Sequence, residues 1–416
     1  MQSVARLVAA SLVATSVALG APSAAGGQTS GAKAEIGDVL DVRARAMLSG
    51  DREGFLATVA PDQPEFRRRQ IRLFDGFQRL GLESYSLDAT DRFWPELTTA
   101  RERSRYPSEA VVLHVEERYA IRGYDRQPAL EDLYLTFVRG PGGWVIASDQ
   151  DLSDLALYSG RKLWENGPIR VARSEHFLFV SHPDLAPAAR RVLRAAERAL
   201  RRVQGRWPLP WHQRVLILAP STEDELQRLI QASFDLDVFV AFAASGVDRA
   251  RDWQLAGHRI LLNWPNFSAY PEETSEEILV HELLHIATRD DAGPMIPIYV
   301  EEGVAEWVTG ERPGGLLQTA VRSGRFDERL PDDHEFVSGS DREIVTAYAE
   351  STAAAVFAVE RFGRERVASF YDVLGEIRRA PGIADHHVDA VMQDVFGLTA
   401  GTFEEEWARW TRRTLR

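Results

Sequence analysis

Hydrophobic positions in the first part of the chain recur at helical spacing and then change to a strand pattern. The helical spacing predicts helices over residues 36–47, 51–59 and 65–80. Runs rich in β-branched and aromatic residues predict strands over residues 110–115, 118–121, 132–138 and 144–147. A Gly-Pro-Gly-Gly turn at 140–143 leads into the last of them. We therefore expect a small α+β unit in which helices precede an antiparallel meander.

A second unit begins near Gly167, with strands first and helices after. Strands are predicted over residues 169–171, 176–180, 214–218, 238–243 and 258–262. An Arg- and Ala-rich helix is predicted over residues 184–204, and beyond residue 271 the pattern is mostly helical. Both units therefore predict the α+β class, with a small mixed sheet and a helical C-terminal part in the second.

Two histidines stand at metal-binding spacing in the segment TSEEILVHELLHIA, residues 274–287. Thr274 and Glu277 have the spacing of a capping box, so a helix is expected to start there. His281 and His285 then lie one turn apart on one helix face, where two imidazoles can hold one cation. The alternative is a surface helix whose histidines are merely polar.

Glu282 follows the first histidine directly and lies about 100° around the helix from it. It would flank the metal without binding it, which suits a general base acting on metal-bound water. A structural metal site would not need this carboxylate.

A third ligand is expected from the segment PIYVEEGVAEW, residues 297–307. Pro297 suits the first turn of a helix. Gly303 inside that helix costs about 1 kcal/mol relative to Ala, which makes sense if the helix comes very close to the histidine helix. Such an approach would bring a carboxylate to the metal, and two His and one Glu leave a fourth position open for water.

These two segments resemble the gluzincin metallopeptidases, and most closely the peptidase-MA-like domain. In that family's W-L-x-E-G-x-A-E motif the Glu before the Gly binds the metal, which implies Glu302, and not Glu301, as the third ligand. Tyr299 replaces the family's Trp. The resemblance also implies one Zn²⁺ per chain, and an orienting role for Glu306 behind a His ligand. A solvated surface carboxylate is the alternative for Glu306.

The resemblance extends, more weakly, over roughly residues 165–416. An AYAES segment at 347–351 opens a helix that is expected to end at Gly363, and WARW at 407–410 is similar to the family's C-terminal helix. Tyr348 could supply a hydroxyl to a developing oxyanion, as a Tyr does in some gluzincins, or it could simply pack. His334 is another possible donor, although its charged loop favours an ordinary surface role.

The N-terminal unit resembles the nuclear-transport-factor-2-like fold by the order of its elements alone, and no catalytic constellation is found in it. The predicted organisation is a signal peptide at 1–25, a linker at 26–34, this α+β cone at 35–155 and a zincin-like domain at 165–416. Residues 260–264 could form the sheet edge that receives an extended substrate, and a buried central strand is the alternative.

Composition narrows the chemistry further. The formal charge of −13 argues against nucleic acid or an anionic membrane as the main partner. The chain has no cysteine, so a transition-metal site must use His and carboxylate ligands. Arg6, an apolar run at 7–20 and small residues to 26 predict export, by a cleaved signal or an uncleaved anchor. No other segment approaches a membrane span.

The sequence therefore predicts an exported, secreted or cell-surface, zinc peptidase that hydrolyses peptide or protein substrates with metal-activated water and a Glu base. The alternative is a non-catalytic or latent cell-surface binding protein on a zincin scaffold. A third possibility is an enzyme whose N-terminal domain covers the cleft until a labile junction near residues 150–168 is cut.

Overall fold

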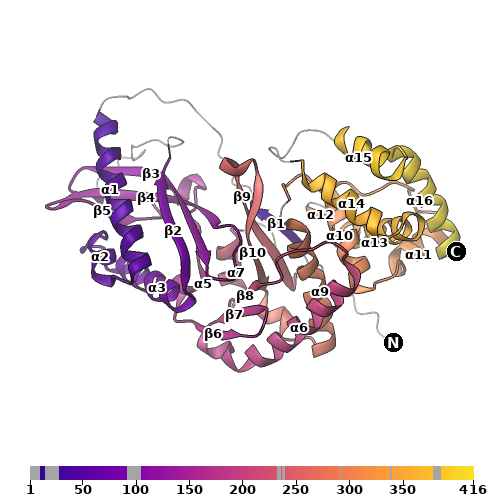
Figure 1. Cartoon of the computed structure of the whole chain (residues 1–416), viewed down its shortest axis with the longest axis horizontal. Coiled ribbons are helices and arrows are strands. Elements are labelled where there is room, and N and C mark those ends of the chain that lie inside the picture. Colours follow the sequence, from indigo (N-terminus) through magenta and orange to yellow (C-terminus); the bar gives the residue numbers. More distant parts are fainter. Residues whose placement is uncertain are drawn as a thin grey trace.

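The computed structural model describes residues 10–14, 28–90, 105–231, 236, 239–290, 292–337, 340–377 and 386–416. It confirms the predicted α+β class, with two sheets near the middle of the molecule and helices around and beyond them (Figure 1). Of the predicted signal peptide, residues 1–25, only residues 10–14 are described, as strand β1 (Ala10–Ala14). The rest of that prediction lies outside the described residues.

The N-terminal unit has the predicted order of helices followed by an antiparallel meander. Its helices are α1 (Gln28–Ser49), α2 (Arg52–Ala57) and α3 (Pro64–Leu80). Its sheet has the order β2 (Leu82–Ala89), β3 (Ala110–Ile121), β4 (Ala129–Gly140) and β5 (Gly143–Ser148). The strand β2 was not predicted, because a register shift between Leu82 and Ser84 interrupts the alternation of its side chains.

The predicted linker at 26–34 is wrong from residue 28 onward, because α1 begins at Gln28. Its Ala32, Lys33 and Ala34 are good helix formers, and Ala32 packs against the hydrophobic core. The Gly- and Ser-rich composition before them hid this extension. Residues 26 and 27 lie outside the described part of the chain.

The second sheet is mixed and has six strands in the order β1, β9, β10, β8, β7, β6. Its remaining strands are β6 (Arg170–Arg173), β7 (Phe177–Ser181), β8 (Val215–Ala219), β9 (Ala241–Asp248) and β10 (Gln254–Leu262). β10 pairs with β8 on one side and β9 on the other. The hypothesis of a substrate-receiving edge at 260–264 is therefore wrong. Residues 260–262 are buried in a central strand, and Trp264 already begins the short helix α8 (Trp264–Phe267).

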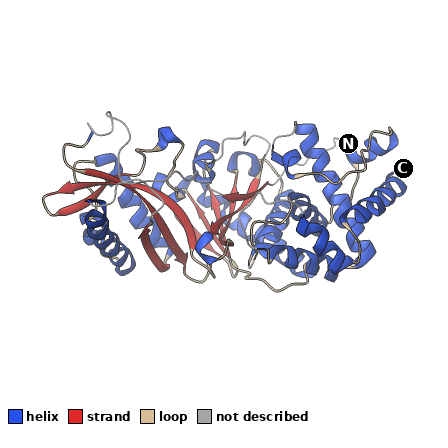
Figure 2. Ribbon diagram, turned by 90° about the horizontal axis from the view of Figure 1, so that it is seen from above, coloured by secondary structure: helices blue, strands red, loops and turns tan. Residues whose placement is uncertain are grey.

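Helices form the rest of the chain, and Figure 2 shows the C-terminal part as almost entirely helical. Their bounds are α5 (Leu163–Asn166), α6 (Ala189–Arg206), α7 (Glu223–Ile230), α9 (Glu272–Arg289), α10 (Ile298–Thr309), α11 (Gly315–Arg322), α12 (Asp333–Val337), α13 (Asp341–Phe362), α14 (Arg364–Gly375), α15 (His386–Phe396) and α16 (Ala400–Leu415). Within the described residues, no helix has both the length and the apolar character of a membrane span.

The central strands β7 and β8 of the six-stranded sheet are buried on both faces. In β7, Phe177 and Phe179 join the core formed with α6 and α9, whereas Leu178 and Val180 join the core of the N-terminal unit. This alternation follows from the two-residue period of a strand. The predicted domains at 35–155 and 165–416 therefore share a hydrophobic core.

The junction between the two units is packed into that shared core. Lys162 is buried and pairs with Glu117 of β3. Trp164 is 1% exposed and fills the space left by Gly76, where a Cβ would lie 2.3 Å from its side chain. A protease needs an exposed backbone, so residues 159–165 do not fit the predicted labile junction at 150–168. Residues 153–156 of the same stretch are exposed, and there the prediction stays open.

Candidate metal centre

The histidine helix α9 begins at Glu272, two residues earlier than predicted, and Thr274 forms no cap. Pro271 is the N-cap, and its carbonyl accepts hydrogen bonds from the N–H and the hydroxyl of Ser275. Glu272 and Glu273 in the first turn suit the positive end of the helix dipole. Arg198 of α6 anchors this end through Glu272 at 2.7 Å and Glu276 at 2.6 Å.

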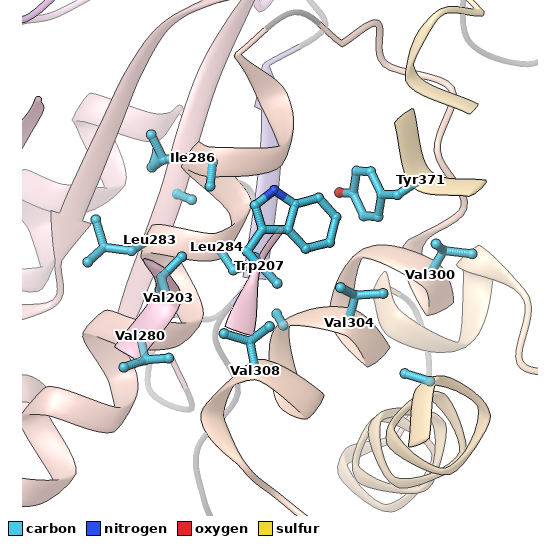
Figure 3. Packing of buried hydrophobic residues seen from close by; sticks show 14 of the residues in the cluster. Val203, Trp207, Val280, Leu283, Leu284, Ile286, Val300, Val304, Val308 and Tyr371 are labelled. Carbon is cyan, nitrogen blue, oxygen red and sulfur yellow. The ribbon is translucent and has the colours of Figure 1, made fainter. Parts of the chain in front are cut away.

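The second site helix, α10, is held on two faces. Val300, Val304 and Val308 form an apolar stripe at helical spacing, which packs with Trp207 and Leu284 (Figure 3). Pro297 is the N-cap of this helix, one position before the predicted first turn.

Gly303 lies on a different face of α10, and there the sequence-based expectation is wrong in one respect. A Cβ on Gly303 would lie 2.4 Å from the backbone oxygen of Ser351 in α13. The close approach that requires glycine is therefore to α13, and not to the histidine helix. The valine stripe faces α9, and Gly303 lies about 100° around the helix from Val304, where α13 passes.

His281, His285 and Glu302 come together as a buried triangle of ligand atoms. The Nε2 atoms of His281 and His285 are 3.0 Å apart. The Glu302 Oε2 atom lies 3.0 Å from the first of them and 3.6 Å from the second. Tetrahedral zinc with bonds of about 2.0–2.1 Å holds its ligand atoms about 3.3 Å apart. Within the described residues, no other cluster of histidine and acidic side chains is compact enough to hold a metal ion.

An unpaired buried atom of the triangle also fits a cation. Glu302 Oε1 is buried without a hydrogen-bond partner. Buried polar atoms are nearly always bonded, so such an atom calls for an explanation. Two imidazole nitrogens that face each other at 3.0 Å also need either a shared proton or a cation between them. The donor set of two His and one Glu suits Zn²⁺ in particular.

The pKa shifts describe the same competition between a proton and a cation. Burial opposes charge on His281, but the Glu302 and Glu306 carboxylates raise the pKa of this imidazole well above its usual value. Burial lowers the pKa of His285. Despite burial, the two imidazoles lower the pKa of Glu302 to about 2. Because metal ligands must be deprotonated, metal binding would release the proton from His281.

Glu282 lies beside the triangle and is fully buried. Burial raises the pKa of its carboxyl to about 8, and neither oxygen accepts a hydrogen bond of normal geometry. The nearby backbone N–H of Ala243 in β9 acts in the opposite direction and lowers this pKa. A buried carboxyl with a pKa close to neutral can both take up and release a proton.

The structure brings Glu306 to the outer side of the His281 ring. Its Oε1 lies 3.2 Å from the Nδ1 of His281, whose Nε2 faces Glu302. This is the arrangement in which a carboxylate fixes the orientation and tautomer of a ligand imidazole.

Tyr348 of α13 also reaches the site. Burial raises the pKa of its hydroxyl well above the usual value, and the carboxylates of Glu302, Glu306 and Glu282 raise it further. The ring packs edge-on against Phe336 at 5.4 Å. The ring of Tyr348 therefore packs against Phe336, while its hydroxyl lies near the carboxylates of the site. His334 lies exposed on α12.

Two charged residues of the site were not found by sequence reasoning. Arg289 and Glu301 are both buried, and the Nη2 of Arg289 donates to Glu301 Oε2 at 3.3 Å. Arg289 stands one turn after His285, so a charged residue on the buried stripe of α9 was the available signal.

Comparison with known proteins adds no assignment. No protein-family profile matches the chain, and no curated protein or solved structure matches it either. Function must therefore be inferred from the geometry and chemistry of the site.

Proposed function

We propose that the protein is an exported, zinc-dependent peptidase whose metal is held by His281, His285 and Glu302. One observation carries the proposal: three deprotonatable ligands at zinc spacing lie beside a buried carboxylate, Glu282, that has no hydrogen-bond partner. Export rests on the N-terminal signal pattern, and the gluzincin resemblance supplies the peptide substrate class.

Bound Zn²⁺ would lower the pKa of a water molecule and polarise the carbonyl that is attacked. Glu282 takes a proton from the attacking water as its oxygen bonds to the carbonyl carbon. The same carboxyl then delivers this proton to the leaving amine nitrogen as the C–N bond breaks. Burial raises the pKa of this carboxyl, and a cation at the neighbouring ligands would lower it toward the carboxylate form that the first transfer needs.

Two further side chains assist these steps. Glu306 holds the His281 ring so that its Nε2 faces the ligand triangle. Tyr348 offers its hydroxyl to the oxyanion that develops on the carbonyl oxygen, and its raised pKa keeps that hydroxyl protonated as a donor.

A non-catalytic binding protein on the same scaffold is the competing proposal. The unpaired carboxylate of Glu282 argues against it, because burying an unpartnered carboxyl costs free energy without serving a structural metal site. No observation favours the binding protein specifically.

The test is peptide hydrolysis and zinc content of the wild type, Glu282→Gln and Glu273→Gln. Glu282→Gln keeps the size of the side chain but not the base, so zinc should stay while kcat falls by about 10²–10⁴. Glu273 is exposed on the same helix and serves as the matched control. Bound zinc without turnover of any peptide in a broad library would favour the binding protein.

A further inference from the structure

Arg289 is the last residue of the histidine helix, and its side chain is completely enclosed by protein. Its Nη1 donates to the backbone oxygen of Ala243 in β9 at 2.7 Å. Its Nη2 donates to the carboxylate of Glu301 at the start of α10. One guanidinium therefore ties together α9, α10 and β9.

These tied points are the immediate neighbours of the site. Glu301 precedes the ligand Glu302, so holding Glu301 fixes the backbone that carries the third ligand. Ala243 is held by Arg289 through its carbonyl, while its N–H faces Glu282. The contacts of Arg289 thus end next to a metal ligand on one side and next to the base on the other.

Stability alone explains this arrangement poorly. A buried ion pair is seldom more stable than apolar side chains of the same volume, because both charges lose their hydration. The Nε of Arg289 is also buried without a hydrogen-bond partner, which adds to this cost. What the buried pair does provide is a fixed arrangement of α9, α10 and β9.

We infer that Arg289 and Glu301 form a positioning pair, which sets Glu302 and the Ala243 backbone at the distances that zinc binding and catalysis need. This inference rests on the proposed zinc site and extends it by two residues that do not touch the metal. The pair acts through Glu302 and Ala243.

The test compares Arg289→Met, Glu301→Gln and the double variant Arg289→Met/Glu301→Leu with the wild type, all as full chains. Zinc affinity is measured by chelator competition, and stability is measured by thermal unfolding of the metal-free protein. The kcat and KM of peptide hydrolysis are measured at saturating zinc. The matched control is Arg198→Met, which removes two ion pairs from the other end of α9. Glu301→Gln keeps the size of the side chain but removes the charge that pairs with Arg289, and so carries the test if Arg289→Met does not fold.

Each single variant should weaken zinc binding by about 10- to 100-fold. It should also lower kcat while KM changes by less than about twofold. The double variant, with no unpaired charge, should regain the stability of the metal-free wild type but not its zinc affinity or kcat. Arg198→Met should keep wild-type zinc affinity.

If the double variant has the zinc affinity and kcat of the wild type, the positioning role is overturned, because the pair would then only stabilise the fold. Wild-type values in every single variant would overturn it as well. A wild type that binds no zinc would overturn the proposed function and the pair's role together. The two outcomes above would overturn the pair's role alone, so the two failures can be told apart.

Discussion

Replacing Gly303 with alanine tests how closely α10 and α13 must approach for the site to form. The added Cβ would lie 2.4 Å from the backbone oxygen of Ser351 and 3.3 Å from the Cβ of Ala355. Ordinary contact begins at 3.4 Å, so the two helices must move apart by about 1 Å. Backbone atoms cannot move aside as a flexible side chain can.

The expected loss is larger for activity than for stability. Alanine is favoured over glycine inside a helix by about 1 kcal/mol, whereas overpacking costs about 1–3 kcal/mol, so the net loss is up to about 2 kcal/mol. Tyr348 stands on α13 one turn before Ser351 and would move away from Glu302 with that helix. A displacement of about 1 Å at a reacting centre can cost about 10²-fold in rate.

Thermal unfolding of the metal-free protein and kcat at saturating zinc measure the two effects separately. The matched control is Gly205→Ala in α6, where a Cβ would meet nothing within 4 Å. This control should be as stable as the wild type or up to about 1 kcal/mol more stable, with unchanged turnover. A Gly303→Ala variant with wild-type stability and wild-type turnover would refute the close-approach reasoning.

Three further predictions concern single side chains of the site. Glu306→Ala should weaken zinc binding by about 10- to 100-fold in chelator competition, and an unchanged affinity would show that the contact to His281 is incidental. Tyr348→Phe should lower kcat by about 10²–10³ with zinc affinity kept, whereas an unchanged kcat would leave it a packing residue. In the metal-free wild type, the raised pKa of Glu282 means that the folded state alone holds a proton between about pH 4.5 and 8. Unfolding free energy should therefore fall across this range, by at most about 5 kcal/mol from this group, and Glu282→Gln should make the fall smaller in urea titrations. Above pH 6.5 the raised pKa of His281 adds a fall that both proteins share. Equal pH slopes for the two proteins would contradict this prediction.

The histidine helix α9 and the positions of His281, Glu282 and His285 on it were predictable because their signal is local. Helical spacing places His281 and His285 on one face, and their Nε2 atoms lie 3.0 Å apart in the structure. Glu302 and Glu306 followed from a motif on one helix, and both lie where that motif implied. The order of helices and strands was predictable for the same reason, since each element has its own hydrophobic period.

The remaining features depend on contacts between distant segments, which no local pattern encodes. The residues of β10 predict a strand, but its central position in the sheet depends on pairing with β8 and β9 and could not be predicted from those residues. Gly303 indicated that another backbone comes close to α10, but its sequence could not show that this backbone belongs to α13. The valine stripe of α10 packs toward α9. The role of Arg289 needs Ala243 and Glu301 brought to it by the fold.

Zinc titration of the full-length chain tests the central claim most directly, with His281→Ala, His285→Ala and Glu302→Ala measured beside it. We predict one zinc per wild-type chain and a loss of tight binding in each variant, because each removes one of three protein ligands. A folded wild-type chain that binds no zinc, or variants that bind it as tightly as the wild type, would contradict the proposed metal centre.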